Sequence, residues 1–152
     1  MMLEITNDYH IKKEEFFHIL ESMKSDNQEV QYNPITELSK NIFSSENEDI
    51  YLTFADMKEL FWCHTDINIV TLSGDDIKEG LSYIAQTKEI NNQESLCFHF
   101  HLHYEYLIQD ISDAMESIYE STNEKANIAF CISSHKNNNL NKVKIDCFLS
   151  PN

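Results

Sequence analysis

The sequence predicts an α/β fold of the α+β type, a two-layer sandwich in which a mixed sheet of about four strands carries helices on one face. Hydrophobic residues make up 41% of the 152-residue chain, which is typical of a single folded domain. Apolar positions alternate strictly along residues 96–103, as in a half-buried strand. They recur every three or four positions along residues 105–120, as in an amphipathic helix.

Residues 1–34 are predicted to form an N-terminal helical extension, followed by the sandwich domain at residues 35–152. Within the extension, apolar side chains recur at helical spacing over residues 12–24. Asn33 and Pro34 then form a favourable helix start, because Asn caps a first turn and Pro is tolerated in it. The helix that they start is expected to continue to about residue 43.

Two capping patterns predict helix starts in the middle of the chain. Thr53 and Asp56 fit a capping box with Asp in the position usually held by Glu or Gln. Ser73 and Asp76 repeat the spacing and start a helix predicted over residues 74–87. Gly80 lies inside that helix, where glycine is unfavourable, and we attribute it to close packing of the helix against the sheet.

The remaining apolar runs predict strands, at residues 67–72, 96–103, 127–132 and 143–149. An Asn-rich hairpin loop over residues 133–141 is expected to join the last two strands. Strands that alternate with helices favour one α/β layer architecture. We therefore expect helices 74–87 and 105–120 to lie together on one face of the sheet.

Charge and composition argue against several function classes. The chain has 11 Lys and Arg against 26 Asp and Glu, a net charge of −15, which disfavours nucleic acid and anionic membranes as partners. Only two glycines are present, too few for the Gly-rich loops that hold phosphates, so we expect no GTP binding. There is no targeting segment, no long apolar run and no C-x-x-C among the four cysteines. These features predict a reduced, cytoplasmic protein.

Three segments carry a resemblance to a known family. Residues 50–57 read I-Y-L-T-F-A-D-M, close to the family pattern I-N-x-D-F-A-D-V. Residues 116–130 match its helix, turn and A-N-I-I-F strand, and residues 142–150 match its final strand. In this order and at these distances, the segments resemble the C-terminal domain of FtsZ, the bacterial tubulin-like cell-division GTPase. The resemblance covers about residues 34–150 and implies a C-terminal domain standing without the GTPase domain.

The resemblance implies a protein-binding role rather than catalysis. In the family, the loop matching residues 50–56 offers two acidic residues that complete GTP hydrolysis in the neighbouring subunit of a filament. Here Thr53 replaces the first, and only Asp56 matches the second. We therefore expect a non-catalytic module that binds a protein partner, modulates or caps FtsZ-type filaments, or associates with itself. The expected partner-binding residues are Tyr51, Thr53, Phe54, Asp56 and Trp62.

Two of these residues also have simpler interpretations. The carboxylate of Asp56 could orient a water molecule against a phosphate held by another subunit. It could equally serve only the first turn of its helix, where the helix dipole favours negative charge. Trp62 could be a binding hot spot or an ordinary anchor of the hydrophobic core.

Three histidines form a second candidate site, for a metal ion. His99, His101 and His103 share one face of the predicted strand, because successive side chains alternate. Two His at positions i and i+2 can bind one zinc ion. Cys131 and Asp146 would add ligands if the neighbouring strands keep their apolar residues on the same side. The alternative function is therefore a metal-binding protein or metal-dependent enzyme; the simpler interpretation is a half-exposed sheet face that tolerates histidine.

Overall fold

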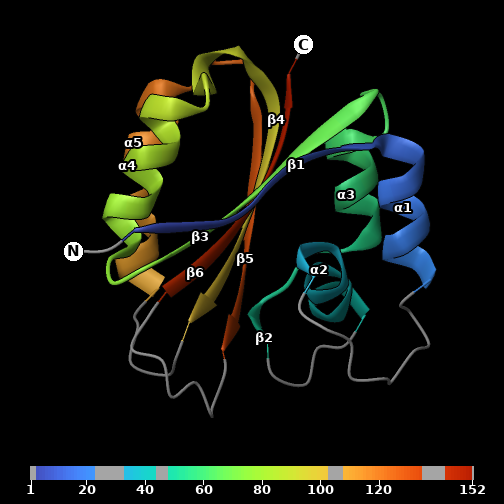
Figure 1. Ribbon diagram of the computed structural model, residues 1–152, viewed down its shortest axis with the longest axis horizontal. Helices are drawn as coiled ribbons and strands as arrows, with labels where there is room; N and C mark the ends of the chain where they lie inside the picture. Colours follow the sequence, from blue (N-terminus) through green and yellow to red (C-terminus); the bar gives the residue numbers. More distant parts are fainter. Residues whose placement is uncertain (1–2, 23–32, 44–47, 103–107, 135–142, 152) are drawn as a thin grey trace.

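The computed structural model describes residues 3–22, 33–43, 48–102, 108–134 and 143–151. Its centre is a six-stranded mixed sheet in the order β1-β3-β6-β4-β5-β2 (Figure 1). The strands are β1 (Glu4–Lys12), β2 (Glu48–Ile50), β3 (Asp66–Gly74), β4 (Gln93–Leu102), β5 (Asn127–Ser134) and β6 (Val143–Pro151). The predicted α/β class and mixed sheet are confirmed, and β1 and β2 add one strand at each edge of the four that the sequence predicts.

The strand order shows that the last two strands do not form a hairpin. β4 pairs with β5 in parallel and with β6 antiparallel, so β4 lies between them. The parallel pair needs a crossover, which contains α5 (Ile108–Ser121). The predicted hairpin is wrong. A polar connection has the same sequence character whether it joins two adjacent strands or two strands that are separated by a third strand. Residues 135–142 of that connection lie outside the described residues.

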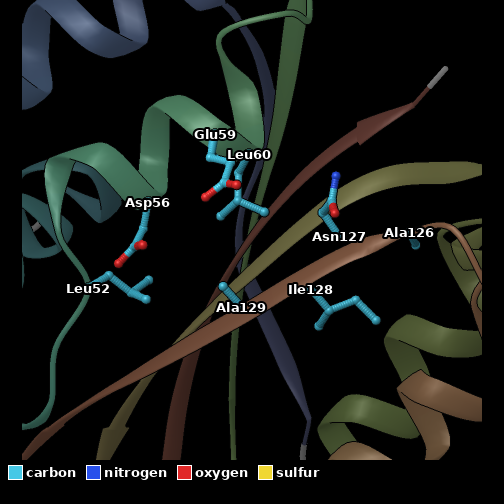
Figure 2. Close-up of a pocket in the computed structure, with 8 residues that line it drawn as sticks. All are labelled: Leu52, Asp56, Glu59, Leu60, Ala126, Asn127, Ile128 and Ala129. Atoms are coloured by element: carbon cyan, nitrogen blue, oxygen red, sulfur yellow. The ribbon is translucent and has the colours of Figure 1, made fainter.

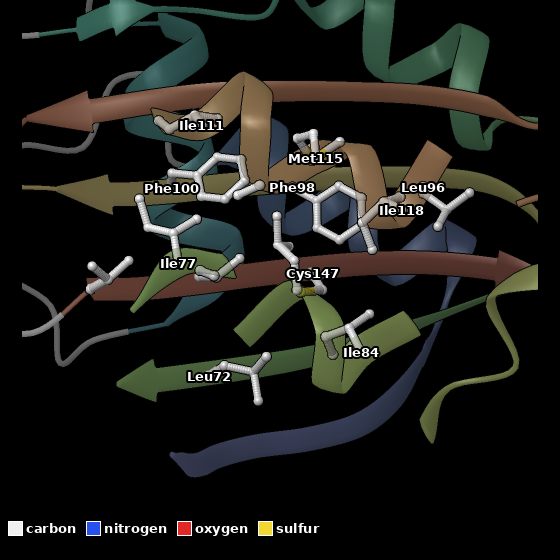
Figure 3. Packing of buried hydrophobic residues seen from close by; sticks show 14 of the residues in the cluster. Leu72, Ile77, Ile84, Leu96, Phe98, Phe100, Ile111, Met115, Ile118 and Cys147 are labelled. Atoms are coloured by element: carbon white, nitrogen blue, oxygen red, sulfur yellow. The ribbon is translucent and has the colours of Figure 1, made fainter. Parts of the chain in front are cut away.

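Two helices, α4 (Ile77–Thr87) and α5, cover one face of the sheet, as the sequence predicts (Figures 1 and 3). Figure 3 shows strand residues packed against helix residues, among them Leu72, Leu96, Phe98, Phe100, Ile84, Ile111, Met115 and Ile118. A Cβ atom on Gly80 would lie 3.2 Å from the Cδ1 atom of Ile145. This close approach confirms the prediction that α4 packs tightly against the sheet at Gly80.

The opposite face of the sheet is covered as well. α1 (Lys13–Ser22), α2 (Pro34–Phe43) and α3 (Phe54–Phe61) lie on it (Figure 1). Their buried residues Phe16, Leu38 and Met57 form a second core cluster with sheet residues that include Ile69 and Phe148. The helices on this face add a layer to the predicted sandwich, so the interpretation of this face as half-exposed is wrong.

The N-terminal segment joins the sheet instead of forming only a helical extension. β1 pairs antiparallel with β3 from Glu4 to Lys12. α1, which confirms the helix predicted over residues 12–24, follows it directly. β1 is at the sheet edge, and Ile11 is its one buried residue. Apolar residues do alternate with polar ones in this strand, at Ile5, Tyr9 and Ile11, but Asn7 interrupts the pattern.

Two predicted helix starts had different outcomes. The Oδ1 atom of Asn33 accepts a hydrogen bond from the backbone N–H of Ile35 at 2.8 Å, which confirms the start of α2. The start of α4 is later than predicted, because β3 continues through Gly74. Asp76 caps the helix, and its side chain accepts a hydrogen bond from the N–H of Lys78 at 3.0 Å.

Within the described ranges, no helix has the length and apolar character needed to cross a membrane.

Candidate functional site

A capping box fixes the loop that enters α3. The hydroxyl of Thr53 accepts a hydrogen bond from the N–H of Asp56 at 3.1 Å, and the Asp56 carboxylate accepts from the N–H of Thr53 at 2.9 Å. The two bonds satisfy backbone donors that a helix start leaves open. The capping box that the sequence predicts at Thr53 and Asp56 is therefore confirmed, and Asp56 lies in the first turn of its helix.

Two large aromatic side chains are exposed at the two ends of this segment. Tyr51, before α3, is 58% exposed, and Trp62, after it, is 52% exposed. Trp62 is therefore not the core anchor considered as its alternative. Phe17 meets its ring edge-on at 5.2 Å, and the Lys13 ammonium lies 4.7 Å from the ring centroid. These contacts hold one side of the indole in place and leave the rest open to a partner.

Phe54, the third apolar residue of the predicted partner surface, is only partly buried. It packs edge-on against Phe17 at 5.9 Å between ring centroids, and the Lys58 ammonium lies 4.9 Å from its ring. The structure therefore brings Phe54 and Trp62 together over Phe17.

A hollow of about 360 Å³ lies between α3 and β5 (Figure 2). One side is lined by Leu52, Asp56, Glu59 and Leu60, and the other by residues 126–129. Sequence reasoning finds only Asp56 among these residues. The two walls are about 70 positions apart in the chain, and nothing in either segment indicates that they meet.

Two of the three predicted histidines lie close to an aspartate in the core. The ligand atoms of His99, His101 and Asp146 all lie within 4.8 Å of one another, and all three residues are buried. Nε2 of His101 is 2.8 Å from Oδ2 of Asp146, and the two imidazole rings are 4.0 Å apart between centroids. His103 lies outside the described residues.

The predicted placement of Cys131 and Asp146 on the histidine face follows from the register. His99 is paired with Cys131 on β5 and with Asp146 on β6, and directly paired residues project from the same side of a sheet. Cys131 and His99 are both buried. The sheet face that carries the second core cluster therefore also carries buried polar groups.

These polar groups belong to a row of hydrogen bonds that runs across the sheet. On one side, Thr71 donates to Oδ1 of Asp146 at 2.8 Å, and the amide of Asn7 donates to Thr71 at 3.1 Å. On the other side, Nε2 of His99 is 2.7 Å from the hydroxyl of Ser133. The row satisfies buried polar atoms that would otherwise be costly.

Asn41 of α2 extends this row to the loop before α3. Its amide nitrogen donates to the Ser133 hydroxyl at 3.3 Å and to the carbonyl of Ile50 at 3.2 Å. Its Oδ1 atom accepts from the N–H of Leu52 at 3.1 Å. The buried row therefore positions the same loop that carries Tyr51.

Three cysteines, Cys97, Cys131 and Cys147, are buried, and Cys63 is exposed. Burial raises the pKa of the Cys97 thiol, with a smaller contribution from the Asp56 carboxylate. Burial also raises the pKa of Cys147 well above its usual range, and Asp146 adds to the effect. Both thiols therefore stay protonated near neutral pH.

Comparison with known proteins identifies the fold through structures alone. No protein-family model matches the chain, and no curated protein matches it. An empty FtsZ dimer from M. jannaschii matches 78% of this chain with a TM-score of 0.65 and 16% sequence identity. A Trp-to-Tyr variant of FtsZ from the same organism matches 78% with a TM-score of 0.61 and 17% identity.

The chain spans only part of the proteins that it matches. It covers 36% of the first FtsZ chain and 37% of the second. At these sequence identities the likeness concerns the fold, and it agrees with the resemblance that the sequence motifs carry. The chain has an α/β fold similar to that of part of the FtsZ chain.

Proposed function

We propose that this chain is a non-catalytic protein-binding module whose partner is an FtsZ-type protein. The observation that carries the proposal is the pair of exposed rings, Tyr51 and Trp62, at the two ends of the α3 segment. Large aromatic side chains are enriched among the residues that dominate the energy of protein interfaces. This segment also resembles the FtsZ loop that meets the next subunit.

The state of Asp56 supports binding without catalysis. Its carboxylate accepts a hydrogen bond from the N–H of Thr53 as part of the capping box. Asp56 therefore stabilises the start of α3. Thr53 stands where the family has an acidic residue. A module with this loop would occupy the nucleotide face of an FtsZ-type subunit without completing hydrolysis, and it would thereby modulate or cap the filament.

The test is a calorimetric titration of this 152-residue chain into the FtsZ-type protein of the same organism in its GTP-bound form. We expect binding, and we expect Tyr51→Ala or Trp62→Ala to weaken it at least tenfold. Tyr119→Ala is the matched control, because Tyr119 is an equally exposed ring, 51% accessible, on α5 across the sheet. Absence of binding, or equal losses in all three variants, would contradict the proposal.

A second candidate function is binding of a zinc ion by His99, His101 and Asp146. The observation in its favour is that three ligand atoms of suitable type lie within 4.8 Å of one another. A ligand that binds only the native state stabilises it by about 2.7 kcal/mol at 100 times its Kd. The chain refolded with excess Zn²⁺ should therefore melt at a higher temperature than with chelator, and His101→Gln should remove the difference. Equal melting temperatures would eliminate this candidate.

A further inference from the structure

In the part of the chain that the structure describes, the outer edge of β5 is only partly covered by another strand. β2 pairs with β5 only around Ile132 and Ser133, and β4 occupies the other edge of β5 along its whole length. Among the described residues, no strand pairs with Asn127–Phe130 on the outer side. Residues 127–130 are exposed or half-buried, whereas residues 131–133 are buried. Within the described residues, this part of the strand therefore has no strand partner on its outer side, as in an edge strand.

The hollow described above lies along this open edge. Figure 2 shows α3 residues facing Ala129 and Asn127 of β5 across it. Leu52, Leu60 and Ala129 supply apolar surface. The volume of about 360 Å³ falls at the lower end of the roughly 300–1,000 Å³ that ligand pockets occupy. The space beside β5 is thus a partly open groove between the strand and α3.

The charges at the hollow select the kind of occupant. The two charged residues that line it, Asp56 and Glu59, are both acidic. Lys58, the cation of α3, is directed elsewhere, with its ammonium 4.9 Å from the Phe54 ring and 5.6 Å from the Trp62 ring. The whole chain carries a net charge of −15. Charge complementarity therefore favours a basic ligand.

We propose that this hollow binds an extended, Lys- or Arg-rich segment of a partner protein, which adds as a strand to β5 beyond the end of β2. The inference rests on the proposed function, because it names the class of segment that the module would take from its partner. Backbone hydrogen bonds to the open edge would supply affinity. Every second side chain of the added strand would point toward α3, where Asp56 and Glu59 lie.

The experiment follows the amide resonances of the isotope-labelled 152-residue chain during titration with an eight-residue peptide of alternating Lys and Val. We expect shifts concentrated at Asn127–Phe130 and in α3. A peptide with N-methyl groups at alternate residues keeps the charge but loses strand donors, and a peptide with Glu in place of Lys reverses the charge. Both should bind at least tenfold more weakly.

Protein variants test the same contact from the other side. Glu59→Lys should weaken binding of the Lys–Val peptide at least tenfold. Glu79→Lys changes the net charge equally on α4, where Glu79 is exposed on the other helix layer, and should leave the affinity unchanged. Shifts elsewhere on the chain, equal binding of the N-methylated peptide, or equal effects of the two variants would overturn the proposal.

The outcomes separate this inference from the proposed function. If Tyr51→Ala weakens binding of the FtsZ-type protein but the Lys–Val peptide shifts no resonance of β5, the strand-addition site is wrong and the proposed function stands. If the peptide binds along β5 and the FtsZ-type protein does not bind, the site stands and its partner is a different protein.

Discussion

Asp146 has no exposed surface, and two buried side chains form hydrogen bonds with its carboxylate. Thr71 donates to one oxygen, and His101 lies 2.8 Å from the other. Asp146→Ala removes both interactions and leaves two polar groups buried without this acceptor. Because leaving a buried polar group without its hydrogen-bond partner costs about 1–3 kcal/mol, we expect a loss of at least that size in the free energy of unfolding, measured with urea.

The control for this variant is Asp75→Ala, which alters an exposed residue in the turn before α4. Surface changes of this kind usually alter stability by less than about 0.5 kcal/mol. If Asp146→Ala cost no more than Asp75→Ala, the polar row across the sheet would not contribute to the stability of the core.

The cysteines give a second prediction about single residues. In the native protein, the exposed thiol of Cys63 should react with a disulfide reagent within the mixing time, and the buried thiols of Cys97, Cys131 and Cys147 should react only after unfolding. Burial also raises the pKa of Cys97 and Cys147, which lowers the fraction of reactive thiolate. The test is to measure the chromophore that the reagent releases per chain, first in the native protein and then after urea is added.

Cys63→Ser should abolish the fast reaction and leave the slow one. More than one fast thiol in the native chain would mean that one of the two hydrophobic core clusters is open to solvent.

Among the structural elements, α3 depends on the capping box at its start. Thr53→Ala removes the oxygen that accepts from the N–H of Asp56, and loss of such a cap costs about 1 kcal/mol. Thr53→Ser keeps that oxygen and should restore most of the stability, as measured by urea unfolding. Equal stabilities of the Ala and Ser variants would show that the cap does not hold the helix start.

The elements also show which signals in a sequence can be used. The capping box, the start of α2 at Asn33 and the amphipathic helices depend on residues within a few positions of one another, so local patterns predict them. β1 was missed although Ile5, Tyr9 and Ile11 alternate with polar residues, because Asn7 interrupts the alternation. The hairpin was wrong because strand order is decided by pairing between distant segments.

Features of the whole molecule depend on register and layer packing. Alternation placed His99 and His101 on one face, and it placed Asp146 beside them once the neighbouring strands were assumed to align. The covering of that face by α1 and α2, the row through Thr71 and Ser133, and the hollow between α3 and β5 needed the three-dimensional structure. Each joins residues whose separation in the chain carries no local signal.

The central claim of this account concerns the whole chain acting on a filament-forming partner. The direct measurement is light scattering and GTP turnover of the FtsZ-type protein from the same organism, with this chain added at substoichiometric amounts. The account predicts less polymer and no GTP hydrolysis by the chain itself, and it predicts that Tyr51→Ala loses the effect while Tyr119→Ala retains it. Unchanged scattering and turnover at every ratio would contradict it.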